Sequence, residues 1–190
     1  MTVQIGNTAM DFRPLMVVIA ILLAIIAFYI VQGIVLNRRC QKIAKAMTVG
    51  DYDYVIAKGE RVLAIYQTYN KRRSSKSLAQ WIEYLNFALG VSYFAIQDND
   101  NFLKHITVLT ASENTKQFWL SLYYIRQNEI EIAQGHYNQI EKNEDTLTSR
   151  DFLESMFLYK NGERQEAKEK MQTVIPKLKH KILKQLADEI

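Results

Sequence analysis

Residues 87–98 read FALGVSYFAIQD, and residues 118–129 read FWLSLYYIRQNE. Each stretch carries apolar residues at helical spacing and ends in a polar pair, Gln97-Asp98 or Asn128-Glu129, that interrupts the pattern. A third polar pair, Gly162-Glu163, follows at a similar interval. Because each of these turns lies between two segments of helical periodicity, we predict a series of antiparallel helix pairs.

A fourth polar turn, Gly50-Asp51-Tyr52, precedes Gln97 by a longer interval than those that separate the later turns. The extra length falls in Tyr69–Ser77, a basic stretch with three serines. We expect this stretch to form an exposed loop, because serine and charge runs favour irregular backbone. Two interpretations of the loop stay open, a solvated connection and a contact with anionic lipid.

Small residues stand before the three later turns, at Gly90, Ser121 and Ser155, where they let two helices approach closely. Together with Leu89 and Tyr93, and the same pattern one unit later, they resemble the tetratricopeptide repeat, a helix-turn-helix of about 34 residues. The second helices of the later units carry the small and large residues of that family: Ala133, Tyr137 and Ile140, then Ala167, Met171 and Val174.

The resemblance implies an all-α fold with an α-solenoid of about four helical hairpins over residues 37–176. The scarcity of glycine (7) and proline (2) independently disfavours a turn-rich all-β fold. The first pair departs from the family pattern, with Val55 and Gly59 where alanine and an aromatic residue are usual. A helical bundle without repeats therefore stays open as the alternative.

A second feature, the segment Pro14–Leu36, contains no charged residue. As a helix it would be about 34 Å long, which is enough to cross a hydrocarbon core of about 30 Å. We predict a transmembrane helix over residues 14–36. A cleaved signal peptide is not expected, because the basic start, the short apolar region and the small-residue cleavage site are missing.

The flanking charges predict the orientation of this helix. Asp11 and Arg13 cancel before it, whereas the basic residues that follow it have no acidic neighbour before Asp51. These membrane-proximal basic residues are Arg38, Arg39, Lys42 and Lys45. By the positive-inside rule, residues 1–13 are extracytoplasmic and the C-terminal domain is cytoplasmic, at the cell membrane.

The C-terminal residues 177–190 carry Leu178, Ile182, Leu186 and Ile190 at a spacing of four, with lysines on the other faces. We expect one amphipathic helix that caps the last hairpin and keeps a repeat array soluble. A basic amphipathic helix that lies on the membrane is the alternative.

The sequence contains no recognisable motif of a catalytic, nucleotide-binding or metal-binding site. The one cysteine and three scattered histidines lack metal-ligand spacing, and no glycine-rich phosphate loop or serine triad signature occurs. We therefore expect no enzyme activity, no catalytic, cofactor-binding or metal site, and no small-molecule substrate. The net charge of +4 comes without a nucleic-acid reader motif, so we expect no nucleic-acid partner.

The remaining candidate is a surface for protein partners. In a tetratricopeptide stack the first helix of each hairpin lines a concave groove. The resemblance therefore nominates residues on one face of each first helix, and a basic residue at the rim of the groove in each of the last two hairpins. They are Phe87, Val91 and Phe94; Phe118, Leu122, Ile125 and Arg126; and Phe152, Met156, Tyr159 and Lys160. Each of these side chains also fits ordinary core packing.

Phenylalanines stand where the peptide-binding members of that family place the basic residues that clamp a terminal carboxylate. The resemblance therefore implies an apolar partner, such as an amphipathic helix or extended segment. We expect a membrane-anchored scaffold or adaptor that contacts the lipid bilayer and membrane-associated proteins. The alternative is a structural or assembly subunit of a membrane complex, with the transmembrane helix as its main interface.

Overall fold

The computed structural model describes residues 2–5, 8–11, 13–72 and 75–190. It divides into two compact units, Met1–Gln41 and Lys42–Ile190, which we describe separately. Apart from one short strand pair, the described secondary structure is helical, as the sequence predicts.

The strand pair lies at the N-terminus and was not predicted. Strands β1 (Thr2–Ile5) and β2 (Thr8–Asp11) are antiparallel, and Thr2 is paired with Asp11 and Ile5 with Thr8. Threonine, valine and isoleucine in β1 favour extended backbone, but so short a strand gives no clear periodic signal in the sequence.

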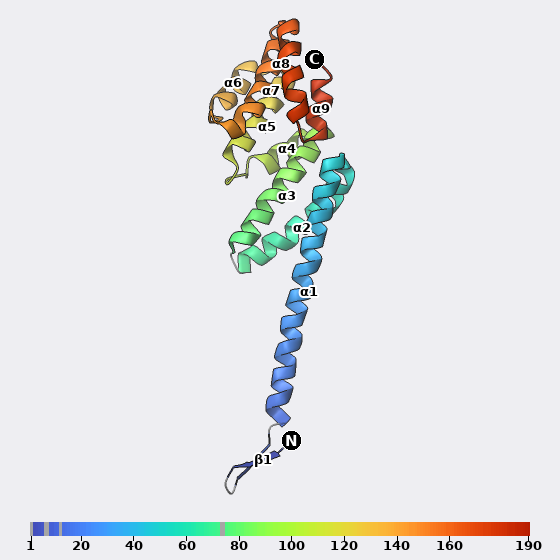
Figure 1. The fold of residues 1–190 in the computed structure, drawn as a ribbon, viewed down its shortest axis with the longest axis vertical. Coiled ribbons are helices and arrows are strands. Elements are labelled where there is room, and N and C mark those ends of the chain that lie inside the picture. The colour runs from blue at the N-terminus through green and yellow to red at the C-terminus, as the bar shows by residue number, and fades with distance from the viewer. Residues whose placement is uncertain (1, 6–7, 12, 73–74) are drawn as a thin grey trace. The chain divides into compact units, whose positions relative to one another are not determined.

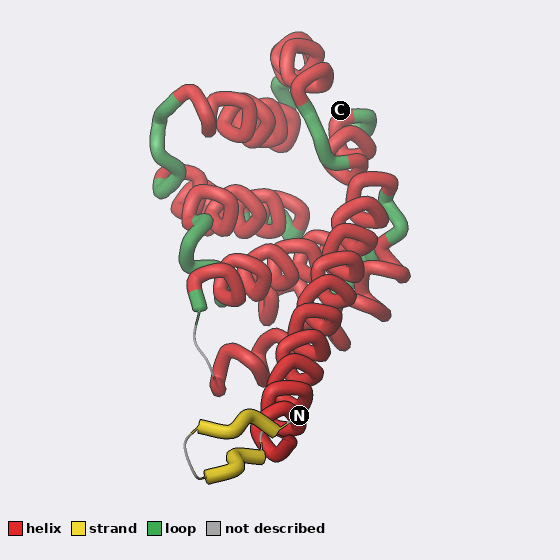
Figure 2. Tube along the Cα trace, turned by 60° about the horizontal axis from the view of Figure 1, so that its bottom comes forward, coloured by secondary structure: helices red, strands yellow, loops and turns green. Residues whose placement is uncertain are grey.

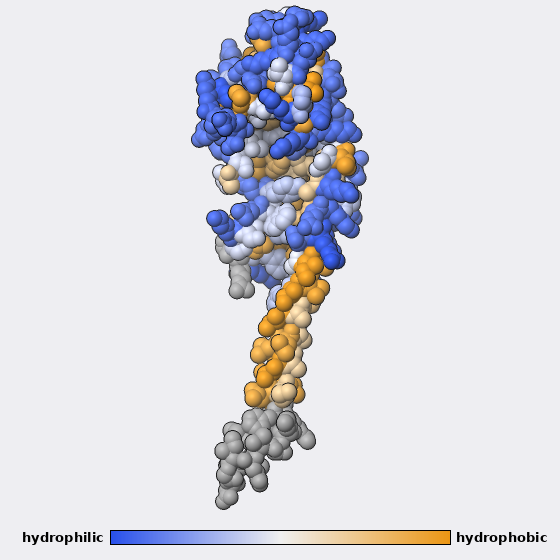
Figure 3. All heavy atoms as spheres, in the orientation of Figure 1, coloured by the Kyte–Doolittle hydropathy of each residue, from blue (hydrophilic) through white to orange (hydrophobic). Residues whose placement is uncertain are grey.

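Helix α1 (Arg13–Val49) contains the predicted transmembrane segment and continues beyond Leu36. Its apolar part is long and hydrophobic enough to cross a membrane, and its most apolar stretch is not buried in the structure. The large apolar side chains between Leu15 and Val35 are exposed, and Figure 3 shows them as a continuous hydrophobic surface. Such a surface is expected of a helix that has lipid as its solvent.

The second unit is built from helices joined by short connections (Figure 1). Beyond the end of α1 they are α2 (Tyr52–Arg72), α3 (Lys76–Ala95), α4 (Asn99–Ile106), α5 (Glu113–Arg126), α6 (Ile130–Asn138), α7 (Glu144–Lys160), α8 (Arg164–Val174), the 3₁₀ turn η1 (Ile175–Lys177) and α9 (Lys181–Ala187). The pairs α2–α3, α3–α4, α5–α6 and α7–α8 pack closely, and α5 also packs on α7. Figure 2 shows helices joined by loops and turns.

All four predicted turns are present and share one geometry. Gly50, Gln97, Asn128 and Gly162 each have a positive φ between 63° and 90°. After each of them, the next residue donates its backbone N–H to the carbonyl five residues earlier, as Asp98 does to Tyr93 at 3.0 Å. This hydrogen bond defines the Schellman motif, which ends a helix by satisfying a free carbonyl. The next residue is also the N-cap of α4, α6 or α8 at the three later turns.

The predicted loop at Tyr69–Ser77 is wrong for most of its length. Helix α2 extends to Arg72 and α3 begins at Lys76, and Ser75 caps α3 by accepting the Leu78 N–H at 3.2 Å. Arg73 and Ser74 lie outside the described residues. The longer interval before Gln97 instead reflects longer helices, since α2 and α3 have 21 and 20 residues and the later helices are shorter.

The predicted single C-terminal helix is also wrong. Pro176 lies in the 3₁₀ turn η1, and the backbone is extended at Leu178 and His180, so α9 has only seven residues. The segment packs on α3, where the His180 ring contacts Phe87 at 5.8 Å, and on the turn after α1, where the Lys181 side chain lies beside Gly50. Leu178, Ile182 and Leu186 are nevertheless buried, as an amphipathic segment requires, whereas Ile190 is half-buried.

Close approach within the hairpins occurs where the small residues predict it. A methyl group at Gly90 would lie 2.6 Å from Cδ1 of Ile106 on α4. One hairpin later, the Ser121 hydroxyl donates to the carbonyl oxygen of Ala133 on α6 at 2.9 Å. Both positions are buried, so a larger side chain would separate the paired helices.

Candidate functional site

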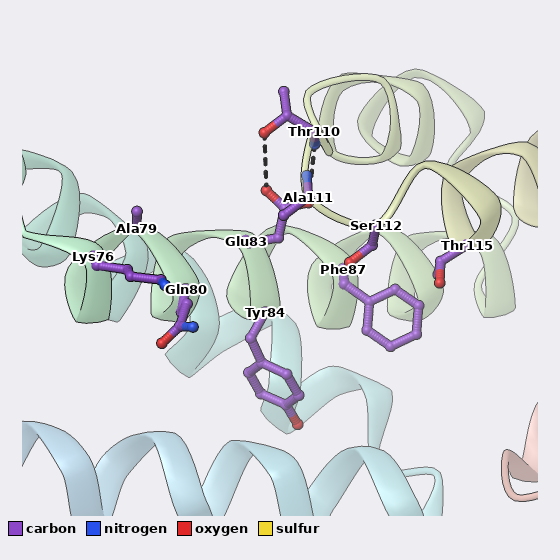
Figure 4. Close-up of a pocket in the computed structure, with 10 residues that line it drawn as sticks. All are labelled: Lys76, Ala79, Gln80, Glu83, Tyr84, Phe87, Thr110, Ala111, Ser112 and Thr115. Carbon is purple, nitrogen blue, oxygen red and sulfur yellow. Dashed lines mark hydrogen bonds between the residues drawn. The ribbon is translucent and has the colours of Figure 1, made fainter. Parts of the chain in front are cut away.

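A hollow of about 560 Å³ lies over the N-terminal half of α3 and the α4–α5 connection (Figure 4). Its lining side chains come from one stripe of α3 and from the residues that lead into α5. They are Lys76, Ala79, Gln80, Glu83, Tyr84, Phe87, Thr110, Ala111, Ser112 and Thr115. We call this hollow the α3 hollow.

Two rings form the apolar part of the α3 hollow. Gln80, Tyr84 and Phe87 are spaced by four and three positions, so they share one face of α3. In Figure 4 the Tyr84 and Phe87 rings project from the same side of the helix. Phe87 also contacts the Trp119 ring at 6.4 Å, which holds it between α3 and α5.

Glu83 fixes the opposite wall. Its Oε1 accepts the backbone N–H groups of Thr110 and Ala111 at 2.9 and 2.8 Å, and these bonds are drawn in Figure 4. The carboxylate thereby satisfies two backbone N–H groups that precede α5, and it fixes the rim of the hollow. Asn114, at the corresponding position of the next hairpin, does the same for the next connection by accepting the Glu141 N–H at 3.1 Å.

A second hollow, of about 460 Å³, shares Ala79, Glu83 and Thr110 with the first and extends between α2, α3 and α4. Its wall contains the buried His105, whose Nε2 lies 3.0 Å from Glu60 Oε1 and whose Nδ1 lies 2.9 Å from Asn86 Oδ1. The Tyr93 hydroxyl also donates to Glu60.

Burial controls the titration of this cluster. It lowers the pKa of His105, and the neighbouring Glu60 carboxylate opposes that shift without cancelling it. Burial, together with the hydrogen bond to Glu60, raises the pKa of Tyr93 to about 12. The cluster links three helices through hydrogen bonds and contains no nucleophile poised beside a base.

Among the described residues, no group of three His, Cys, Asp or Glu side chains is placed to hold a metal ion. The described part of the hollow walls likewise lacks the glycine-rich backbone that holds a phosphate. The arrangement is suited to binding a segment between rings and fixed hydrogen-bonding groups.

Most of the predicted groove residues lie in the core. Seven of them, Val91, Phe94, Phe118, Leu122, Ile125, Phe152 and Met156, are buried. They pack between the hairpins, as Phe118 does on Phe152 at 6.0 Å. In this structure these side chains therefore occupy the positions of core residues, the second interpretation that the sequence allowed.

The other four predicted residues are separated. Phe87 is the only one of the eleven in the described lining of the α3 hollow. Arg126 stacks over the Phe94 ring at 5.0 Å, and Tyr159 contacts Arg164 at 5.9 Å. Lys160 is exposed, as are the four membrane-proximal basic residues Arg38, Arg39, Lys42 and Lys45.

Sequence reasoning missed Lys76, Ala79, Gln80 and Tyr84. These residues continue the Phe87 stripe toward the N-terminus of α3, so helical spacing could have located them. Only Lys76 lies within the expected loop at Tyr69–Ser77. Ala79, Gln80 and Tyr84 follow that loop and were not among the residues that the resemblance nominated. Glu83 gave no signal, because its partners are backbone groups.

No family model, curated protein or solved structure matches this chain. The assignment of a function therefore depends on the sequence pattern and on the geometry of the helical unit.

Proposed function

We propose that this protein is a single-pass membrane protein whose helical unit, residues 42–190, binds an apolar segment of another protein. Helix α1 would supply the anchor, with residues 1–13 outside and the helical unit in the cytoplasm. The length and hydropathy of α1 support the anchor, and the basic residues after Leu36 support the orientation.

The family part of the proposal is a tetratricopeptide-like array. Three successive helix pairs share the Schellman turn, and the ties from Glu83 and Asn114 to the following connection occupy corresponding positions of consecutive hairpins. Stacked helix pairs of this kind present extended surfaces to protein partners. The same observations would be coincidences in a bundle without repeats.

The α3 hollow is the observation that carries the binding proposal. It combines the rings of Tyr84 and Phe87 with a few polar groups of fixed direction, which is the usual composition of a binding cavity. The Glu83 charge is engaged by two N–H groups, so the hollow presents a largely apolar floor. An aliphatic or aromatic side chain of a helix or extended segment fits such a floor.

The alternative function, an assembly subunit that works through α1, is favoured by the exposed apolar surface of that helix. Lipid alone also satisfies this surface, so the helix by itself does not identify a protein neighbour.

Site-specific photo-cross-linking of the full chain in its native membrane tests the proposal. A photoreactive residue at Gln80 should form one discrete protein adduct, whereas one at the exposed Gln172 on α8 should not. Ala79→Trp fills the α3 hollow from an exposed position and should abolish the Gln80 adduct without changing the unfolding midpoint.

Equal adducts at Gln80 and Gln172, or a Gln80 adduct that survives Ala79→Trp, would contradict binding in the hollow. Discrete adducts obtained only from a photoreactive residue at Ile26 in α1 would favour the assembly-subunit alternative.

A further inference from the structure

The α2–α3 junction has an unusual charge distribution. Residues 61–82 contain five basic residues and no acidic residue, although the whole chain has 24 basic and 20 acidic residues. Three of the five, Lys71, Arg72 and Lys76, flank the junction and are exposed in the structure. With Tyr69, which is 40% exposed, they define what we call the basic corner.

The positive charge of the basic corner is not neutralised within the described chain. The described salt bridges involve other residues, and the nearest acidic residues in sequence, Glu60 and Glu83, bond to His105 and to backbone N–H groups. A surface with several unpaired cations and no interspersed anions attracts a polyanion.

The position of Lys76 is itself unfavourable. It is the first residue of α3, where the helix dipole presents partial positive charge, and the first turn of α3 contains no acidic residue. A cation at this position destabilises an isolated helix. A local loss of helix stability of this kind is expected where a residue binds an external ligand.

Chain connectivity restricts where that ligand would be. The helical unit begins at Lys42, six residues after the apolar segment ends at Leu36. Even a fully extended chain of six residues spans only about 20 Å. Once α1 is inserted, the unit is therefore held at high local concentration against the bilayer surface.

We propose that the basic corner binds the anionic headgroups of the bilayer in which α1 is anchored. Lys71, Arg72 and Lys76 contact the headgroups, and the Tyr69 ring lies at the interface, where amphipathic aromatic side chains are favoured. The basic corner adjoins the α3 hollow, because Lys76 also lines that hollow. The lipid contact depends only on the anchoring part of the proposed function.

The corner favours lipid over nucleic acid. Single-stranded nucleic acid is held by several aromatic platforms along a basic groove, whereas the described corner exposes one tyrosine. A charged surface with one interfacial aromatic residue suits a fluid array of headgroups.

Amide hydrogen exchange of the full chain, reconstituted in nanodiscs, tests this contact. Nanodiscs of phosphatidylcholine alone are compared with nanodiscs of phosphatidylcholine and an equal amount of phosphatidylserine. We expect peptides covering residues 64–72 and 75–82 to exchange more slowly in the anionic bilayer. Because each basic residue contributes about 1 kcal/mol, each charge removed should weaken the protection about fivefold.

Charge variants make the test specific. The triple variant Lys71→Gln, Arg72→Gln, Lys76→Gln should lose the protection, whereas Lys71→Arg with Lys76→Arg should keep it. The matched control Lys142→Gln, Lys160→Gln, Lys168→Gln changes three exposed lysines elsewhere and should behave as the unmodified chain. Circular dichroism should show the same helical content for all variants.

Three outcomes would overturn the proposal. They are equal exchange in the two bilayers, protection that persists in the triple variant, and protection that appears in phosphatidylcholine nanodiscs when inorganic phosphate or a short RNA is added.

Extraction with alkaline carbonate measures anchoring separately. A chain that resists extraction but shows no anionic protection refutes the corner alone, and an extracted chain that is protected refutes the anchor alone.

Discussion

The His136 ring on α6 stacks on the Tyr124 ring of α5, with centroids 5.3 Å apart and an interplanar angle of 5°. The corresponding pair of the preceding hairpin, His105 and Tyr93, has the same arrangement at 5.6 Å and 7°. In both hairpins the histidine Nδ1 lies within 2.9 Å of a side-chain amide oxygen on the first helix, at Asn86 or Gln117. In each of the two hairpins, the same three-residue tie therefore joins the first helix to the second.

The third hairpin keeps the positions and changes the chemistry. Asp151 and Lys170 occupy the positions that Gln117 and His136 hold in the hairpin before, and they form an ion pair at 3.6 Å. Lys170 also binds Glu154, which accepts the Tyr137 hydroxyl. A polar contact between the same positions of the two helices thus recurs in all three hairpins, although the residue types differ.

A first prediction concerns the contact between α3 and α4. Gly90→Ala should destabilise the protein by about 1–3 kcal/mol, because the new methyl group would lie 2.6 Å from Ile106. Gly135→Ala is the matched control, since a methyl group there meets nothing within 4 Å and alanine favours the helix by about 0.5–1 kcal/mol. Urea unfolding in detergent, followed by circular dichroism, measures both. Equal effects of the two changes would refute the close approach.

The turns give a second prediction, because two of the four left-handed positions are occupied by residues other than glycine. Gln97→Gly should stabilise the protein by about 0.5–1 kcal/mol by removing the strain at φ 63°. Asn128→Gly should gain less, since asparagine tolerates this conformation. Gly162→Ala should cost about 1 kcal/mol. Shifts in the unfolding midpoint check the order, and destabilisation by Gln97→Gly would contradict the turn geometry.

Third, the buried residues of the predicted groove should behave as core. Leu122→Ala should cost about 2–5 kcal/mol, because the side chain is fully buried between hairpins. Phe118→Ser should lower both the helical content and the melting temperature. The exposed Leu147→Ala on α7 serves as control and should change the stability little. If Leu122→Ala left the stability unchanged, Leu122 would be available for partner contacts after all.

The histidines predict how stability depends on pH. Burial lowers the pKa of His105, His136 and His180 below the usual 6.5. Between that value and the lower folded-state pKa, the unfolded chain binds more protons than the folded one, so acid favours unfolding. The stabilisation is fully present above about pH 6.5 and is lost as the pH falls through the folded-state pKa values.

The free energy of unfolding should therefore decrease between about pH 6.5 and 5, before carboxylates titrate extensively. Replacing His180 with glutamine removes one of the three groups and should make the decrease shallower. Chemical unfolding at a series of pH values measures the slope, and a stability that rises on acidification over this range would contradict the assignment.

The turns and the apolar helix could be predicted from sequence because their signals are local. A polar pair such as Gln97-Asp98 interrupts helical periodicity, and the apolar run that ends at Leu36 is unmistakable by length and hydropathy. The small residues, such as Gly90, carried enough information to locate the close helix contacts.

The rest depended on tertiary structure. Periodicity identified the Phe118 and Leu122 face but not whether a neighbouring hairpin covers it, since core and groove have the same spacing. The return of the C-terminal segment to Phe87 is a long-range contact with no local signal. The Glu83 tie was hidden because its partners are backbone N–H groups, which every sequence contains.

Protease protection in sealed membrane vesicles of known sidedness, with a tag after Ile190, tests the central claim of a membrane-anchored cytoplasmic interaction domain most directly. The account predicts that the chain stays in the membrane after carbonate extraction and that the tag is digested only when the cytoplasmic face is accessible. Release by carbonate would contradict the anchor. Digestion only from the opposite face would contradict the orientation and place the helical unit outside the cytoplasm.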